Sequence, residues 1–224
     1  MQRTMPLATV MLIVSLSTVS SVSAEENKIS STLDSVDVIH NGVAVTIKRG
    51  HDRNATLPEI FQKTDRGCPP FCVEPMLAAP GIETIGELEV LDFLHRINQG
   101  ESDILVVDSR TPDWVMRGTI PGSVNIPWNK INRDNAGTFE TPTESDSFHH
   151  ILEDEFGVGR NATTGAWDFH DAKTLVLFCN GIWCPQSTAN LKTLVGIGYP
   201  VHKLKWYRGG MQDWVSVGLT TIKP

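Results

Sequence analysis

Two cysteines, Cys179 and Cys184, stand five positions apart in the stretch "LVLFCNGIWCPQS", between an apolar run and a helical pattern. Three kinds of chemistry are open to such a pair. One cysteine can be a nucleophile in an anion-binding loop, the two can form a thiol–disulfide redox pair, or both can be buried thiols that only fill space. The secondary structure predicted around the two cysteines indicates which of these three roles is favoured.

Cys179 ends a short apolar strand, "KTLVLFC", and a helix is predicted to begin near Pro185. Ligands of open parallel sheets bind beyond the carboxyl ends of the strands. We therefore expect the connecting loop to curl into a cradle whose backbone N–H groups stabilise an anion, and a thiolate at Cys179 to be reactive there. The predicted cradle consists of Asn180, Gly181, Ile182, Trp183, Pro185 and Gln186.

A second cysteine pair, Cys68 and Cys72, lies in "GCPPFCVEPM" (67–76), which is too rich in proline for regular structure. Four cysteines allow three pairings, and the sequence does not choose among them. Two local pairs are the simplest arrangement, and a Cys68–Cys72 disulfide is the leading interpretation. Alternatively, this segment folds against the mouth of the Cys179 loop and exchanges disulfides with it. No metal site is expected here, because no neighbouring His or Cys completes a set of four ligands.

The first 24 residues have the pattern of a secretory signal peptide. Arg3 gives a positive start, Leu7 to Leu16 is apolar, and Val22-Ser23-Ala24 fits a cleavage site. The apolar run is shorter than the roughly 20 residues that a spanning helix needs. We therefore expect a signal peptide at 1–24 and a periplasmic or secreted protein that does not contact the membrane after cleavage.

Export would place all four cysteines in a compartment where disulfides persist. The formal net charge of −7 becomes −8 when Arg3, the one charged residue of the signal, is removed. The remaining sequence has no basic stripe of the kind that neutralises phosphates, so nucleic acid is not an expected partner. The histidines at 149, 150 and 170 are interpreted as exposed side chains rather than metal ligands.

Residues 25–81 are predicted to form an N-terminal extension. Within them, "VDVIHNGVAVTIKRG" (36–50) has two β-prone runs around Asn41-Gly42, a strong hairpin signal. An isolated hairpin is marginally stable in water, so we expect it to pack on the main domain. The Cys-Pro-rich loop follows it.

Residues 82–224 alternate between strand and helix patterns. Strands are predicted at 103–110, 123–128, 173–179 and 202–210. Helical patterns are predicted at 85–97, 111–118, 149–157, from Pro185 onward, and at 211–219. Because strands that alternate with helices form parallel sheets covered on both faces, we expect an α/β fold, a three-layer domain with a central parallel sheet flanked by helices.

Three motifs follow one another in this region: "ILVVDSRTPDWVMRGTIPGSVNIPW", "TLVLFC" and "LKWYRGGMQDWVSVGLTT". In order and spacing they resemble the rhodanese-like (sulfurtransferase) family over roughly residues 82–220. The first is similar to the family's Asp-x-Arg, Gly-x-Ile-Pro-Gly-Ala and Asn-Ile-Pro segments. The second is similar to its catalytic strand, and the third to its closing Gly-Gly-x-x-x-Trp segment.

The resemblance implies a nucleophile at Cys179, the first residue of a loop over the sheet. Such a cysteine takes sulfur from a sulfane donor, carries it as a persulfide and passes it to a thiol or other thiophilic acceptor. The resemblance also implies that Asp108 and Arg110 brace the domain and its active loop, with a purely structural ion pair as the alternative. No cofactor is implied.

The loop departs from the family pattern. Cys184 stands at the fifth position after Cys179, where the family has Arg, Thr or Ser, and the loop is about two residues longer than usual. Longer loops of this superfamily occur in phosphatases, but those need an Arg that holds phosphate with two hydrogen bonds, and no Arg or Lys lies between Cys179 and Gln186. Phosphatase activity is therefore excluded. Cys184 is instead predicted to be a resolving thiol that attacks a Cys179 persulfide, releases sulfide and leaves a disulfide.

The leading hypothesis is an exported sulfurtransferase with Cys179 as its sulfur carrier. Its partners would be a small sulfur donor and a thiol acceptor, with a periplasmic redox protein as one candidate. Two alternatives stay open: a thiol–disulfide redox protein that uses Cys179 and Cys184, and a non-catalytic binding module built on the same frame.

Overall fold

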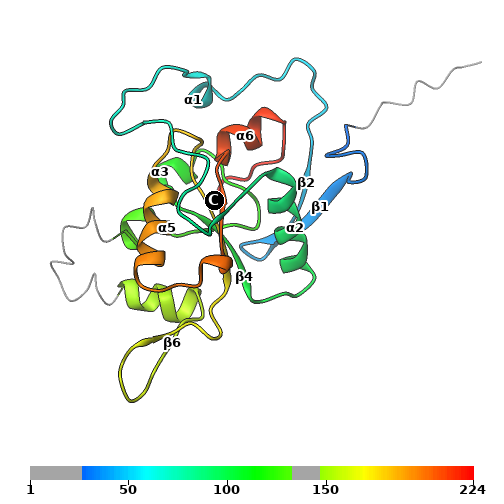
Figure 1. Ribbon diagram of the computed structural model, residues 1–224. Helices are drawn as coiled ribbons and strands as arrows, with labels where there is room; N and C mark the ends of the chain where they lie inside the picture. Colours follow the sequence, from blue (N-terminus) through cyan, green and yellow to red (C-terminus); the bar gives the residue numbers. More distant parts are fainter. Residues whose placement is uncertain (1–26, 133–146) are drawn as a thin grey trace, which may run out of the picture.

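The computed structural model describes residues 27–132 and 147–224, arranged as Figure 1 shows. The predicted signal peptide at 1–24 lies outside the described residues. Within the described ranges, none of the helices is long and apolar enough to cross a membrane.

The centre of the fold is a five-stranded sheet in the order β3-β9-β8-β4-β5. Its strands are β3 (Glu83–Ile85), β9 (Leu204–Tyr207), β8 (Thr174–Phe178), β4 (Ile104–Asp108) and β5 (Val124–Asn125). Every neighbouring pair is parallel. Strands β8 and β4 lie in the middle and are continuous apolar runs, as expected for strands buried on both faces.

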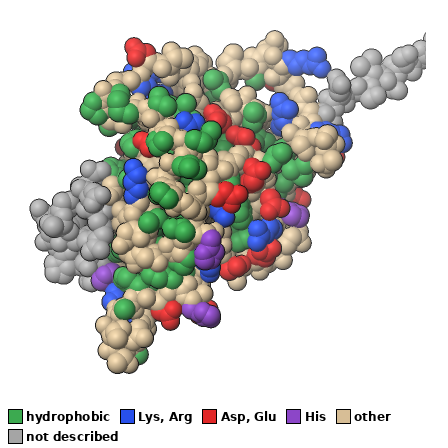
Figure 2. Space-filling model, viewed as in Figure 1, with side chains coloured by type: hydrophobic (Ala, Val, Ile, Leu, Met, Phe, Trp, Pro, Cys, Tyr) green, Lys and Arg blue, Asp and Glu red, His purple; other side chains and the backbone are tan. Residues whose placement is uncertain are grey.

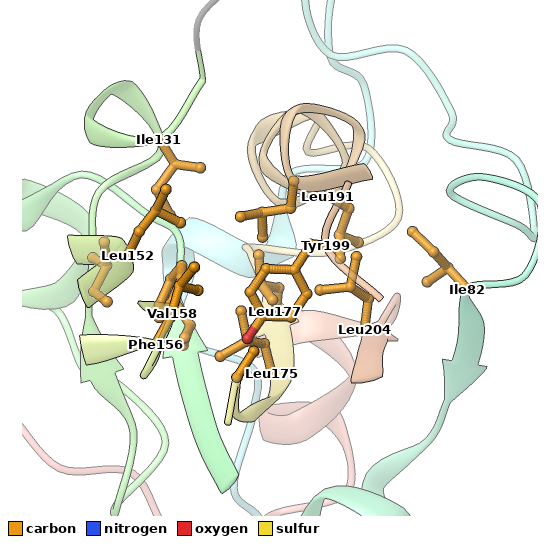
Figure 3. Close-up of a cluster of buried hydrophobic side chains, with 14 of the residues drawn as sticks. Ile82, Ile131, Leu152, Phe156, Val158, Leu175, Leu177, Leu191, Tyr199 and Leu204 are labelled. Carbon is orange, nitrogen blue, oxygen red and sulfur yellow. The ribbon is translucent and has the colours of Figure 1, made fainter. Parts of the chain in front are cut away.

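The two faces of the sheet carry separate cores. Along β8, Leu175 and Leu177 enter one core, and Val176 and Phe178 enter the other, because successive side chains of a strand point to opposite faces. The first core is covered by α5 (Gln186–Gly196) and contains the residues drawn in Figure 3. The second is covered by α2 (Glu87–Asn98) and α6 (Gly210–Ser216). The predicted three-layer α/β fold is therefore confirmed.

The N-terminal hairpin forms as its sequence predicts. Strands β1 (Ser35–His40) and β2 (Val43–Lys48) form an antiparallel pair. The turn that joins them consists of Asn41 and Gly42, whose φ angles are 50° and 79°. The inward-facing Val36 and Val38 join the core beneath α2, so the hairpin packs on the main domain.

Some elements differ from the sequence predictions. The helix predicted from Ile85 begins at Glu87, because residues 83–85 pair in parallel with β9 as the edge strand β3, which the sequence analysis missed. Only Val124–Asn125 of the predicted strand at 123–128 is paired. A small antiparallel pair, β6 (Gly159–Arg160) with β7 (Trp167–Asp168), was not predicted, because strands of two residues each have too little periodicity to be recognised.

Short helical turns complete the described fold. They are α1 (Glu59–Gln62), α3 (Pro112–Val115), η1 (Trp128–Lys130), η2 (Ile151–Glu155) and η3 (Val201–Lys203). Of these, α3 and η2 fall where helical patterns were predicted, and α3 begins at a proline, which suits a first helical turn.

His40 at the end of β1 makes the hairpin's attachment sensitive to pH. Its side chain is 7% exposed, its Nδ1 accepts a hydrogen bond from the Gly122 N–H at 3.2 Å, and burial lowers its pKa below the ordinary 6.5. The fold therefore favours neutral imidazole. The stabilisation is complete well above pH 6.5, where the imidazole is neutral in the unfolded chain as well, and it is lost as the pH falls through 6.5 toward the lower folded-state pKa.

We expect His40→Asn to flatten this dependence, because the asparagine Oδ1 takes the place of the imidazole Nδ1 as acceptor for the Gly122 N–H and does not titrate. Urea unfolding at pH 7.5, 6.5 and 5.5 measures the free energy of unfolding of both proteins. A variant that loses stability with acid as steeply as the wild type contradicts the assignment.

Candidate active site

The cysteine loop lies at the carboxyl end of a central strand. Strand β8 ends at Phe178, Cys179 is the next residue, and α5 begins at Gln186. Cys179 and Cys184 are joined by a disulfide with their Cα atoms 6.1 Å apart, and the two residues are 2% and 3% exposed. The structure therefore brings the predicted nucleophile and the predicted resolving thiol into bonding contact.

The start of α6 fixes the loop backbone. The Cys179 carbonyl accepts a hydrogen bond from the Met211 N–H at 3.0 Å, and the Asn180 carbonyl accepts one from the Gln212 N–H at 2.9 Å. Gly210 makes this approach feasible. It has a φ of +56°, and a Cβ at this position would overlap the Cys179 carbonyl and the Gly181 nitrogen.

The backbone N–H groups of the loop are largely uncommitted. Only the Cys184 N–H is used inside it, donating to the Gly181 carbonyl at 3.0 Å, while Pro185 has no N–H to donate. Within the described parts of the chain, no protein acceptor is bonded to the N–H groups of Asn180, Gly181, Ile182, Trp183 and Gln186. The anion cradle stays a prediction, and Pro185 can contribute only to its shape.

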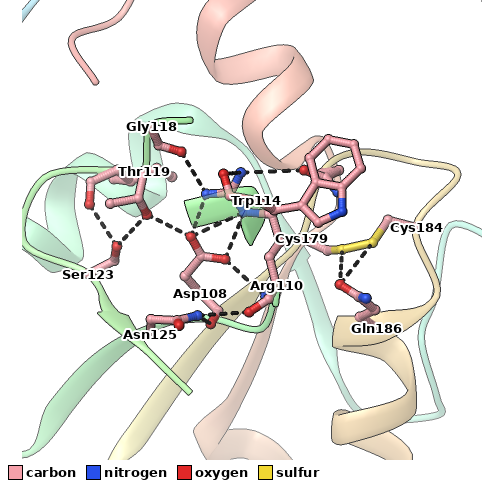
Figure 4. A network of polar contacts seen from close by, with 12 residues as sticks. Asp108, Arg110, Trp114, Gly118, Thr119, Ser123, Asn125, Cys179, Cys184 and Gln186 are labelled. Carbon is pink, nitrogen blue, oxygen red and sulfur yellow. Dashed lines mark hydrogen bonds and ion pairs between the residues drawn. A yellow bond between two sulfur atoms is a disulfide. The ribbon is translucent and has the colours of Figure 1, made fainter. Parts of the chain in front are cut away.

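The Gln186 side chain reaches both sulfurs (Figure 4). Its Oε1 lies 3.4 Å from the Cys179 Sγ and 3.8 Å from the Cys184 Sγ. A reduced thiol can donate a hydrogen bond to this oxygen, and after the amide rotates its NH₂ group can donate to a thiolate. The sequence analysis placed Gln186 in the cradle for its backbone alone, so this contact was missed. No sequence signal gives the direction of one side chain at a helix start.

Aromatic side chains cover the disulfide. Trp183 and Trp114 cluster with the two cysteines, and their ring centroids are 6.3 Å apart. Phe71 meets Trp183 edge-on with centroids 5.7 Å apart, and the Trp183 Nε1–H donates to Gln212 Oε1 at 2.6 Å. We call Phe71, Trp114 and Trp183 the aromatic cap. It keeps bulk water away from the sulfurs.

Asp108 and Arg110 form a buried ion pair beside the loop (Figure 4). The guanidinium donates to both carboxylate oxygens, with Nη2–Oδ2 at 2.6 Å and Nε–Oδ1 at 2.9 Å, and both residues are at most 1% exposed. Arg110 also donates to the Gly118 carbonyl at 2.8 Å and to the Asn180 side-chain oxygen at 3.4 Å. Asn180 directly follows Cys179, so the ion pair contacts the cysteine loop as well as the turn at Gly118.

The segment of residues 66–76, here called the strap, lies against the cysteine loop. It contains a Cys68–Cys72 disulfide with Cα atoms 4.6 Å apart. The Glu74 N–H donates to the Ile182 carbonyl at 2.8 Å, and Thr188 at the start of α5 donates to the Glu74 carboxylate at 3.1 Å. The Cys68–Cys72 disulfide is the local pair of the leading interpretation. The contact between the strap and the cysteine loop is the position that the alternative interpretation predicted.

The strap also places a positively charged side chain, that of Arg66, beside the cysteine loop, which contains no Arg or Lys. The Arg66 guanidinium carbon lies 3.7 Å from the ring centroid of Trp183, and burial lowers the arginine's pKa from its ordinary value. Its Nη2 donates to the Ile60 carbonyl at 2.8 Å, whereas its buried Nε has no hydrogen-bond partner among the described residues. The sequence analysis missed Arg66, because 113 positions separate it from Cys179.

Gly210→Ala tests the close approach of α6 to the loop. The left-handed backbone alone costs a residue with a side chain about 1–2 kcal/mol, and the new methyl group must also push the Cys179 carbonyl away. We expect a larger loss of stability than this strain alone and a slower reoxidation of the Cys179–Cys184 pair. Chemical unfolding and timed alkylation measure the two effects.

Gly42→Ala is the matched control, because Gly42 also has a positive φ of 79° but no atom lies within 4 Å of the position of its Cβ. It should lose stability through strain alone and leave the reoxidation rate unchanged. Equal reoxidation rates in the two variants would contradict the role given to Gly210.

Comparisons with known proteins indicate the family to which the chain belongs. The model of the rhodanese-like domain matches residues 90–217. Among solved structures, a possible tyrosine phosphatase from Rhodopseudomonas palustris is 23% identical with a TM-score of 0.41, covering 65% of this chain and 88% of that one. The polysulfide-sulfur transferase homodimer of Wolinella succinogenes is 17% identical with a TM-score of 0.39, covering 66% and 82%. A rhodanese from E. coli is 17% identical with a TM-score of 0.31, covering 54% and 99%.

The search of curated proteins found no match. The family model spans more than half of the chain, and it includes β4, β8 with the cysteine loop, and α6. The chain therefore belongs to the rhodanese-like domain family.

Proposed function

We propose that the protein is a sulfurtransferase in which Cys179 carries sulfane sulfur as a persulfide and Cys184 can discharge it. One observation supports this most directly. Cys179 is the first residue after the central strand β8, inside a loop whose N–H groups are mostly free, and Cys184 is close enough to bond to it.

The first step loads the sulfur. The Cys179 thiolate attacks the terminal sulfur of a sulfane donor, a sulfur–sulfur bond forms, and the bond in the donor breaks with its electron pair leaving on the remainder of the donor. The persulfide that results carries its negative charge on the outer sulfur. The uncommitted N–H groups of the loop and the Gln186 amide are the donors available to stabilise that charge.

The second step has two outcomes. An external thiolate that attacks the outer sulfur takes it away and restores Cys179. A Cys184 thiolate that attacks the inner sulfur forms the Cys179–Cys184 disulfide and expels hydrosulfide, so that one S–S bond is formed for each one broken. The position of Cys184 supports the second outcome whenever the external thiol is slow to arrive.

The surroundings of the sulfurs favour a donor of low charge. The loop has no Arg or Lys, and the guanidinium of Arg66 lies over Trp183 rather than within the loop. The sulfurs are buried beneath aromatic rings, where an unpaired dianion is costly. Organic persulfides, which carry at most one negative charge on their sulfurs, are therefore proposed as donors in preference to thiosulfate.

A thiol–disulfide redox protein is the second candidate, favoured by the Cys179–Cys184 disulfide itself. In that role electrons pass through the pair, and no sulfur atom is carried. Export through the signal peptide at 1–24 and a periplasmic or secreted location are proposed with either candidate, since two disulfides suit an oxidising compartment.

Sulfur loading can be followed by mass spectrometry of the reduced protein after anaerobic exposure to an organic persulfide. We expect the Cys184→Ser variant to gain one sulfur atom on Cys179 and keep it, because the resolving thiol is absent. The wild type should instead release one hydrosulfide for each Cys179–Cys184 disulfide formed. Cys179→Ser is the matched control and should gain nothing. The proposal fails if Cys184→Ser gains no sulfur, and reversible disulfide formation alone would then favour the redox candidate.

The donor preference gives a further expectation. A hydrogen bond to a charged group contributes about 1.5–3 kcal/mol, so the absence of a loop arginine should make loading from thiosulfate about ten- to a hundredfold slower than loading from an organic persulfide. Rates of persulfide formation in Cys184→Ser measure this ratio. Equal rates would show that the backbone N–H groups suffice for a dianion.

A further inference from the structure

The two disulfides of the protein differ in their access to solvent. Cys179 and Cys184 are 2% and 3% exposed beneath the aromatic cap. On the strap, Cys68 is exposed and Cys72 is half-buried. Thiol–disulfide exchange requires a thiolate to reach a disulfide sulfur, so its rate depends on access. A dithiol carried by another protein can reach the strap pair, whereas the cap blocks the inner pair.

The two disulfide rings are in direct contact. Phe71 belongs to the ring closed by Cys68 and Cys72, and Trp183 belongs to the ring closed by Cys179 and Cys184. Their aromatic rings meet edge-on, with centroids 5.7 Å apart. On either side of the strap disulfide, Arg66 stacks on Trp183 and the Glu74 N–H bonds to the Ile182 carbonyl. The segment that carries the exposed pair is thus held against the loop that carries the buried pair.

The strap can shift without disturbing the sheet. No helix or strand lies between Gln62 and Glu83, and the strap's backbone is anchored mainly at its end, where Arg208 donates to the Glu74 carbonyl at 2.7 Å and the Pro75 carbonyl at 3.0 Å. Segments with few backbone hydrogen bonds to the core open locally at low cost. The relay requires a local opening of this kind, in which the strap and its Phe71 move and a strap sulfur reaches the inner disulfide.

We propose that Cys68 and Cys72 form a relay disulfide that passes electrons from a dithiol protein to the Cys179–Cys184 disulfide. The proposal rests on the proposed function, because discharge of the persulfide by Cys184 leaves the disulfide that the relay reduces. The external dithiol first reduces Cys68–Cys72 and becomes a disulfide itself. One strap thiolate then attacks the inner disulfide and expels the other inner cysteine as a thiolate.

The second strap thiol completes the transfer. It attacks the mixed disulfide, re-forms Cys68–Cys72 and leaves Cys179 and Cys184 reduced. Each exchange breaks one S–S bond and forms one. In sum, two electrons and two protons move from the external dithiol to the inner pair, and the strap returns to its starting state.

The surface of the strap favours a protein as the reductant. Phe71, Val73, Met76 and Leu77 are 39%, 74%, 66% and 58% exposed, an unusual density of apolar side chains beside one disulfide. Figure 2 shows hydrophobic side chains gathered on the upper left of this face, where Figure 1 draws the chain that follows α1. Exposed apolar patches of this kind mark contacts with other proteins.

The first experiment compares the wild type with the double variant Cys68→Ser, Cys72→Ser, both starting with an intact Cys179–Cys184 disulfide. Reduced thioredoxin is added as the protein dithiol, samples are quenched by alkylation, and mass spectrometry follows the inner pair. We expect reduction to be at least about tenfold slower in the double variant, because the accessible disulfide is missing. Reduction of the inner pair by a small phosphine should also be faster in the wild type, because the phosphine reduces the accessible strap disulfide first and the strap thiols then reduce the inner pair. Equal or faster reduction of the double variant by thioredoxin would overturn the proposal.

The second experiment traps the intermediate in the two single variants, Cys68→Ser and Cys72→Ser. Each has one strap thiol that cannot resolve a mixed disulfide, so at least one variant should accumulate an intramolecular bond from the strap to Cys179 or Cys184. Peptide mapping at low protein concentration detects it. An intact Cys179–Cys184 disulfide with a free strap thiol in both variants would sink the relay. No sulfur donor is present, so this outcome is independent of whether Cys179 can be loaded with sulfur.

Discussion

The buried ion pair of Asp108 and Arg110 is the interaction on which the cysteine loop's surroundings depend. The pair is at most 1% exposed, so its two charges must satisfy one another and the groups around them. Arg110 reaches Gly118 and Asn180, and Thr119 donates to the Asp108 carboxylate at 2.6 Å. Removing one partner of a buried pair typically costs about 3–5 kcal/mol, because an uncompensated charge remains. One interaction thus connects strand β4, the turn after α3 and the loop of Cys179.

A second constraint acts from the opposite side of the loop. The first residues of α6 donate hydrogen bonds to the carbonyls of Cys179 and Asn180, and only a glycine at 210 allows the two backbones to come so close. With its carbonyls occupied in this way, the loop keeps its N–H groups available. The chemistry expected of an anion-stabilising loop follows from how its backbone is fixed, and no charged side chain inside the loop contributes to it.

The cysteine loop is closed to solvent, with both of its cysteines buried. Trp183 stands beside Cys184 in sequence and covers it in space, and the strap adds Phe71 and Arg66 above it. In the proposed function, burial would protect the Cys179 persulfide from adventitious thiols and water, but it would also make the disulfide product hard to reduce from outside. A covered sulfur site therefore needs a route for electrons, and the exposed disulfide on the strap lies where such a route would begin.

Local patterns in the sequence were enough to predict the central strands of the sheet, the helices that cover it and the hairpin. Apolar runs of the length of strands, helical spacing and an Asn-Gly turn are signals between near neighbours, and the position of Cys179 after β8 follows from them. Edge strand β3 was missed because three residues carry too little periodicity, and its neighbour β9 lies about 120 positions later. Three further features could not be predicted from the sequence: the side-chain contact of Gln186 with the sulfurs, the arginine over Trp183 and the position of the strap. They are contacts between distant segments or directions of single side chains, set by packing, whereas the sequence by itself determined the strand, the loop and the cysteine that the packing encloses.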